Sequence, residues 1–176
     1  MNNLNVYLKS RHDFVNQFQL LYTYKQLGKE DEVSALIEEM YADLKQEQLF
    51  LNAPCRKFVQ AVFEHKIEIS GSKWTFEIEW SSKDYYQTNL KLSDDVLYRI
   101  YQILKTEIEN QNDDKHVKLA LAVEQEYVIL GVNLTGYSID ELKLNRIFKG
   151  YHYDIVTHDN KEKEIEFLIN INELEV

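Results

Sequence analysis

The stretch that decides the fold is Ser10–Asn16, with the sequence Ser-Arg-His-Asp-Phe-Val-Asn, which lies in a helical run ending near Gly28. At about 100° per residue, helical geometry places a polar stripe on one side of this run. Its members are Asn5, Lys9, His12, Asn16, Gln19 and Thr23. The other side is apolar and comprises Leu4, Tyr7, Leu8, Phe14, Val15, Phe18, Leu21 and Tyr22. The pattern predicts an amphipathic bundle helix with His12 facing water.

A second helix is predicted directly after Gly28, which suits the left-handed position past a helix end. Glu30, Asp31 and Glu32 favour a helix start through the macrodipole. The apolar stripe that follows consists of Val33, Leu36, Ile37, Met40, Leu44 and Leu51. Because two helices cannot bury apolar arcs this broad, we expect a second copy to complete a four-helix bundle. The sequence therefore predicts a homodimer with two outward-facing copies of His12.

A family resemblance rests on these helices. Arg11, His12, Asp13 and Asn16 resemble the phosphoacceptor box of one histidine-kinase subfamily. The agreement continues through Asn16–Leu21 and then Val33, Leu36–Met40 and Asp43, which resemble the helical hairpin of the sporulation initiation phosphotransferase B family. Arginine at position 11 is more kinase-like than the serine expected of that family, so a histidine-kinase remnant phosphorylated by another kinase is an alternative.

The resemblance implies a phosphorelay with His12 as its phosphorylated residue. A single-domain response regulator would donate the phosphoryl group, and a response regulator transcription factor that controls sporulation would accept it. A neutral imidazole has a lone pair that can attack phosphorus. We expect Asp13 to orient the ring or take its proton, Lys9 and Arg11 to supply positive charge, and Asn16 to donate a hydrogen bond near the phosphoryl group.

No cofactor is expected on this chain itself. It offers no metal cage near His12, so Mg²⁺ should come with the acidic pocket of the partner receiver domain. The surface expected to meet that partner is bordered by Gln17, Gln19, Leu20 and Thr23. A third hypothesis is that the dimer is a non-catalytic scaffold that sequesters a response regulator.

Composition narrows the class of protein. The 176 residues are 44% hydrophobic, which favours a packed core, and the net charge of −10 argues against nucleic acid as a partner. Cys55 is the only cysteine, which fits a reducing compartment. No leader and no apolar run of about 18 residues was found, so we expect a cytoplasmic protein without a membrane anchor.

The only proline, Pro54, suggests a boundary between a helical-hairpin domain at residues 1–53 and an α/β domain at residues 54–176. In the second domain, periodicity predicts helices around 58–63, 96–108 and 138–148, with a capping box of Ser138 and Glu141 on the last. Alternation predicts strands at 74–80, 117–123, 127–132, 153–157 and 165–171, the last four forming two hairpins. The fold class expected is α+β.

This element order resembles the ATP-binding domain of histidine kinases, but the boxes that hold the nucleotide there are missing. The five glycines are dispersed along the chain, and Glu107 stands on the helix where magnesium-binding asparagines would be expected. We therefore expect a kinase-like domain that binds no ATP, and a phosphotransferase that is not an autokinase. The remaining histidines, 65, 116, 152 and 158, lack metal-ligand spacing and are interpreted as structural or solvated, and Cys55 as a small buried residue.

Overall fold

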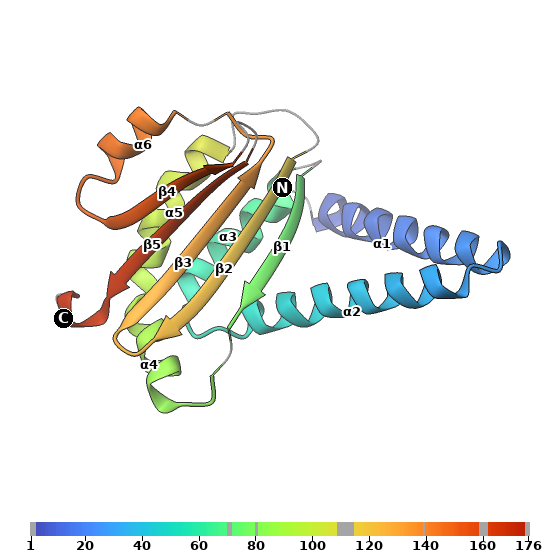
Figure 1. Cartoon of the computed structure of the whole chain (residues 1–176), viewed down its shortest axis with the longest axis horizontal. Coiled ribbons are helices and arrows are strands. Elements are labelled where there is room, and N and C mark those ends of the chain that lie inside the picture. The colour runs from blue at the N-terminus through green and yellow to red at the C-terminus, as the bar shows by residue number, and fades with distance from the viewer. Residues whose placement is uncertain are drawn as a thin grey trace. The chain divides into compact units, whose positions relative to one another are not determined.

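The computed structural model describes residues 3–69, 72–79, 81–108, 115–138, 140–158 and 162–174, without the side chains of residues 3–14. It divides into two compact units, Met1–Lys45 and Gln46–Val176. Helices and one five-stranded mixed sheet make up the chain, which confirms the α+β class (Figure 1). Within the described ranges, no helix combines the length and apolarity needed to cross a membrane.

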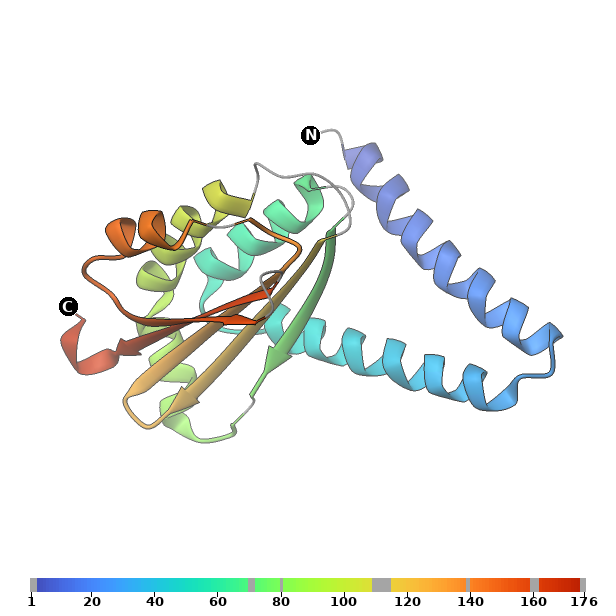
Figure 2. The same ribbon diagram turned by 45° about the horizontal axis from the view of Figure 1, so that its top comes forward.

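The first unit is a helical hairpin. Helix α1 spans Asn3–Gln26 and helix α2 spans Glu30–Leu51, so α2 runs on into the second unit. Gly28 has φ +66°, and the amide N–H of Lys29 donates to the carbonyl oxygen of Tyr24 at 3.0 Å, which closes α1 as predicted. The two helices diverge from this turn (Figure 2). None of the side chains described between Val15 and Lys45 is buried.

The second unit is built on a sheet of order β1-β2-β3-β5-β4. The strands are β1 (Ser72–Ile78), β2 (Lys115–Glu124), β3 (Tyr127–Thr135), β4 (His152–His158) and β5 (Glu162–Asn170). β1 and β2 are parallel, and the remaining pairs are antiparallel. Both predicted hairpins are therefore confirmed, whereas the parallel pairing of β1 was not predicted. Trp80, expected at the end of the first strand, lies outside the described residues.

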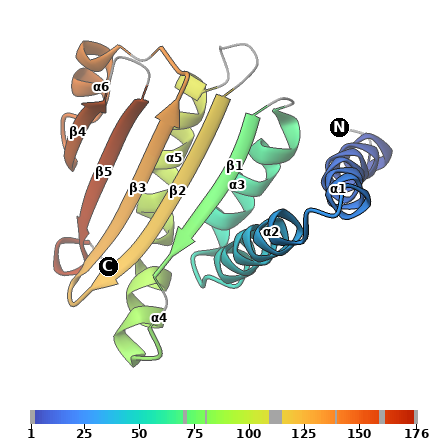
Figure 3. The same ribbon diagram turned by 45° about the vertical axis from the view of Figure 1, so that its right-hand side comes forward.

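Helices α3 (Arg56–Glu68) and α5 (Asp94–Ile108) pack side by side against one face of the sheet (Figure 3). Alternate residues of each central strand point into this layer, so that Val117, Leu119, Val128 and Leu130 are fully or almost fully buried. The remaining elements are helix α4 (Asp84–Leu92), which was not predicted, helix α6 (Glu141–Ile147) and a short 3₁₀ helix η1 (Ile171–Glu173). The core of the molecule lies between this face of the sheet and helices α3 and α5.

One prediction about this unit was wrong. The capping box of Ser138 and Glu141 was wrong, because Asp140 is the N-cap of α6 and its Oδ1 accepts from the amides of Leu142 and Lys143. Asp140 directly precedes the first helical residue, so its carboxylate reaches those amides without a distortion of the chain.

The boundary between the units differs from the one placed near Pro54, because the last turns of α2 belong to the α/β core. Phe50 is fully buried and stacks on Phe76 with ring centroids 4.6 Å apart. Gln46 Oε1 accepts a hydrogen bond of 2.7 Å from the backbone N–H of Ile78 on β1. Tertiary packing, which the local sequence does not reveal, therefore makes the last turns of α2 part of the second unit.

Candidate phosphoacceptor helix

The backbone of the proposed phosphoacceptor segment is helical throughout. Lys9, Arg11, His12 and Asp13 all lie in α1, and no break interrupts the helix between Asn3 and Gln26. Their side chains lie outside the described part of the structure. The predicted solvent orientation of His12 therefore stays a prediction, as do the roles expected of its three neighbours.

The side chains of α1 are described from Val15 onward. Asn16, Gln17, Gln19, Leu20 and Thr23, the other residues predicted for the site, are all exposed. The Thr23 hydroxyl donates to the carbonyl oxygen of Gln19 at 2.8 Å, which holds that side chain against the helix. Leu20 keeps 42% of its surface exposed. This side of the helix can offer a partner amide hydrogen bonds and an apolar contact.

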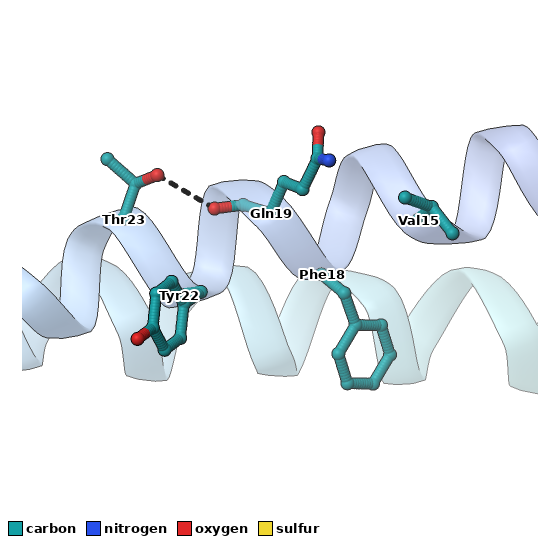
Figure 4. A pocket seen from close by; sticks show the side chains of 5 residues that line it. All are labelled: Val15, Phe18, Gln19, Tyr22 and Thr23. Atoms are coloured by element: carbon teal, nitrogen blue, oxygen red, sulfur yellow. Dashed lines mark hydrogen bonds between the residues drawn. The ribbon is translucent and has the colours of Figure 1, made fainter.

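The apolar side of α1 is also open. A groove of about 610 Å³ is lined by Val15, Phe18, Gln19, Tyr22 and Thr23, all on α1. Phe18 and Tyr22 project on a different side of the helix from Gln19 and Thr23 (Figure 4). Phe18 is 51% and Tyr22 63% exposed, which is high for aromatic rings on the apolar stripe of a helix.

In the α/β unit, the side chain expected to repel a triphosphate already has a charged partner. Glu107, only 12% exposed, lies at the end of α5 and forms an ion pair of 2.7 Å with Lys143 of α6. Gly131 has a structural setting. A Cβ on Gly131, in the middle of β3, would lie 3.1 Å from the Cβ of Ala120 on the neighbouring strand. Within the described ranges, no three His, Cys, Asp or Glu side chains are grouped to hold a metal ion.

The other histidines differ in their surroundings. His65 is fully buried, and its Nδ1 lies 2.5 Å from the hydroxyl of Tyr101. His116 Nε2 lies 2.7 Å from Thr75 Oγ1, and His158 Nε2 lies 3.7 Å from a carboxylate oxygen of Glu164. These contacts agree with a structural role for the first two and a surface role for the third.

Cys55 is buried, as predicted, and burial raises the pKa of its thiol to about 12. A thiol with so high a pKa stays protonated near neutral pH and is a poor nucleophile.

Comparison with known proteins places the helical hairpin in a family context. Residues 1–53 match the family model described as sensor kinase SpoOB-type, alpha-helical domain. The match confirms the predicted resemblance for this segment, which contains His12 and covers 53 of the 176 residues. None of the curated proteins compared with the chain matches it.

Similar solved structures include histidine kinases. The catalytic domain of histidine kinase ThkA in a nucleotide-free form is 20% identical, with 68% of this chain and 91% of that chain covered and a TM-score of 0.43. Acinetobacter baumannii histidine kinase AdeS is 13% identical, with 92% and 98% covered and a TM-score of 0.42. ThkA in complex with response regulator protein TrrA is 15% identical, with 94% and 61% covered and a TM-score of 0.42. At these scores the likenesses assign no activity.

Proposed function

We propose that this protein is a histidine phosphotransferase of a multistep phosphorelay. In this proposal a receiver aspartate donates a phosphoryl group to His12, which passes it to an aspartate of a second response regulator. The observation that carries the proposal is the position of His12 inside α1, within the segment that matches the SpoOB-type helical domain. We extend it to a cytoplasmic role in sporulation initiation, as the resemblance implies.

Each transfer would exchange one bond to phosphorus for another. A ring nitrogen of His12 attacks the phosphorus of the aspartyl phosphate, the P–N bond forms, and the P–O bond breaks to release the carboxylate of the donor. The second step reverses this order, with the acceptor's carboxylate as nucleophile. Most of the catalysis in phosphoryl transfer is positioning and charge stabilisation.

The neighbouring residues would supply that positioning. Asp13 would orient the imidazole, Arg11 and Lys9 would balance phosphoryl charge, and Asn16 would donate a hydrogen bond one turn along the helix. The chain would bind no cofactor, and Mg²⁺ would arrive with the receiver. The exposed Gln17, Gln19, Leu20 and Thr23 would contact that partner; the open amide groups and the exposed Leu20 support this assignment.

A homodimer forms part of the proposal. Large apolar side chains are exposed along both helices of the first unit, namely Val15, Phe18, Tyr22, Ile37, Tyr41 and Leu44. So many exposed apolar residues in one short hairpin favour burial against another surface. A second copy of the hairpin offers a matching apolar surface and would complete a four-helix bundle around a two-fold axis.

The proposed enzyme does not take its phosphoryl group from ATP. The sequence lacks the glycine-rich boxes that let backbone approach phosphates, and Glu107 stands on α5 where magnesium-binding asparagines would be expected. The α/β unit would then support the helices instead of phosphorylating them.

One reconstituted assay tests the proposal. The full chain is incubated with a ³²P-phosphorylated receiver domain and then with a second, unphosphorylated response regulator. We expect label to appear on the wild-type chain and then on the second regulator, and His12→Ala to abolish both steps. His152→Ala, which removes an exposed histidine of β4, is the matched control and should transfer normally.

The result also separates the alternatives. If the wild-type chain bound the receiver without acquiring label, the result would favour the non-catalytic scaffold over the phosphotransferase. Direct labelling from [γ-³²P]ATP would contradict the account of the α/β unit.

A further inference from the structure

The five-stranded sheet has one open face within the α/β unit. Helices α3 and α5 cover the other face, and in Figure 1 no helix from the described part of this unit crosses the front of the sheet. On β5, Ile165, Phe167 and Ile169 are buried toward the helices. The alternate residues point to the open side, where Glu164, Glu166 and Leu168 are exposed.

Two carboxylates lie directly opposite each other on this open face. Asp154 of β4 is the register partner of Glu166 on β5, and both are exposed. Like charges in directly opposed cross-strand positions destabilise a sheet. The neighbour of Glu166 on the other side is Gly131 of β3, which adds no side chain. The only side chain directly opposite Glu166 on its two neighbouring strands is therefore that of Asp154.

Among the described residues, no lysine, arginine or histidine forms an ion pair with Asp154 or Glu166. Lys163, the lysine on β5 nearest in sequence, belongs to the opposite face and forms an ion pair of 2.6 Å with Glu141 of α6. His158 lies 3.7 Å from Glu164 and is charged only when protonated. The potential over the β4–β5 ladder is therefore negative at neutral pH.

An apolar hollow continues the same face. It measures about 360 Å³ and is lined by Tyr127, His152, Leu168, Asn170 and Glu173. Tyr127 is 38% and Leu168 36% exposed, so the hollow presents a ring and an aliphatic side chain to solvent. Leu168 follows Glu166 by two residues on β5, a separation of about 6.8 Å along a strand.

We propose that this face binds an extended, basic segment of a partner protein. One arginine or lysine side chain would lie against the pair formed by Asp154 and Glu166, and an apolar side chain two residues along would enter the hollow. The charge excludes two other occupants, since a nucleic acid or an anionic membrane would be repelled. A second copy of this same face is also disfavoured, because it would bring like-charged pairs of Asp154 and Glu166 together. The proposal does not depend on His12.

The probe is a seven-residue peptide of serines with arginine at its third position and phenylalanine at its fifth, amidated at its C-terminus and labelled with zwitterionic tetramethylrhodamine. A peptide of the same composition with the two residues adjacent serves as the spacing control. Titration of the ¹⁵N-labelled full chain should shift the amide signals of Tyr127, Asp154 and Leu168, and the spacing control should bind more weakly. Fluorescence anisotropy gives the dissociation constants.

The decisive variant is Asp154→Lys, which replaces the repulsive pair with a cross-strand ion pair to Glu166. We expect it to weaken binding by about tenfold or more while leaving the thermal midpoint equal to or above that of wild type. Loss of binding then could not be attributed to unfolding. Leu168→Ser should weaken binding through the hollow. Asp43→Lys on α2 makes the same change in net charge and is the matched control.

Two outcomes would overturn the proposal. One is an equal loss of binding in Asp43→Lys and Asp154→Lys, which would mean that only net charge matters. The other is the absence of any saturable shift at Tyr127, Asp154 and Leu168 with the wild-type chain.

Discussion

The two units of this protein differ in how far their apolar side chains are buried. In the α/β unit, residues such as Phe50, Tyr101 and Phe167 are sealed between helices and sheet. In the helical hairpin, aromatic rings of the same size, such as Phe18 and Tyr22, stand largely in solvent. The α/β unit contains its own core, whereas the described side chains of the hairpin form no buried core and leave an apolar surface exposed. The proposed homodimer would bury that surface.

The largest effect on stability that follows from this difference is expected from two matched Phe→Ala substitutions, one in each unit. Phe50→Ala should lower the free energy of unfolding by about 3–5 kcal/mol, because it leaves a cavity beside Phe76. Phe18→Ala should change the stability of the monomer by less than about 0.5 kcal/mol, because the ring is half exposed. Urea denaturation followed by circular dichroism measures both.

The same two variants also test the proposed homodimer. Analytical ultracentrifugation of Phe18→Ala should show a raised dimer dissociation constant, and Phe50→Ala should keep the wild-type constant under native conditions. If Phe18→Ala proved as destabilising as Phe50→Ala at every protein concentration, the contrast between the units would fail.

The rates at which cysteine thiols are alkylated compare solvent access in the two units. In a Ser34→Cys variant, iodoacetamide at pH 8 should alkylate Cys55 about 1,000-fold more slowly than the introduced thiol, because Cys55 is buried and position 34 is exposed. Peptide mapping by mass spectrometry separates the two sites. Similar rates would mean that the α/β core opens as readily as the hairpin.

The raised pKa of Cys55 also predicts a pH dependence of stability. Between about pH 9 and pH 12 the unfolded chain loses the thiol proton while the folded chain keeps it. The unfolded state then binds fewer protons, so the free energy of unfolding should fall as the pH rises above 9. Urea midpoints at pH 8 and pH 10 for wild type and Cys55→Ala measure this term, which should be absent in the variant.

A smaller effect is expected at the contact between α3 and α5. Asp94 accepts hydrogen bonds from the backbone N–H groups of Lys57 and Phe58 at 3.0 and 2.9 Å, so it caps α3 from another helix. Asp94→Ala should cost about 1–2 kcal/mol. Asp95→Ala removes only an exposed contact with Lys57 and should unfold at nearly the wild-type urea midpoint. Equal losses in the two variants would contradict the capping role.

The smallest effect is expected in the hairpin turn. Gly28→Ala places a side chain at φ +66° and should cost about 1 kcal/mol in the local stability of the turn. Gly150→Ala is the control, because a Cβ there also meets nothing within 4 Å but no positive φ is required. Hydrogen exchange at the amide of Lys29 should be faster in the first variant, while the second should leave it unchanged.

Local patterns predicted much of this architecture. The acidic pair after Ser93 indicated the start of α5, and strict alternation indicated β2 and β3. Helix α4 was missed, although its buried residues Tyr86, Asn89 and Leu90 have helical spacing, because its N-cap, Lys83, makes no capping bond and gives no start signal. The parallel pairing of β1 was not predicted either, because it depends on contacts between residues far apart in the chain.

The candidate site was predicted from residue types, helical spacing and the resemblance to a histidine-kinase phosphoacceptor box. The structure adds the continuous backbone of α1 and the exposure of Asn16, Gln19 and Thr23. The acidic open face of the sheet escaped the sequence analysis for a physical reason. Asp154 and Glu166 become neighbours only through the register of β4 against β5.

The path of α2 has a practical consequence for anyone who dissects this protein. A fragment that started at Pro54 would lack Phe50, which would empty a site beside Phe76, and Gln46, which would strip the amide of Ile78 of its acceptor. A truncation that preserves the α/β fold must instead fall inside α2, before Gln46, and so leaves an exposed helix end on whichever half is kept.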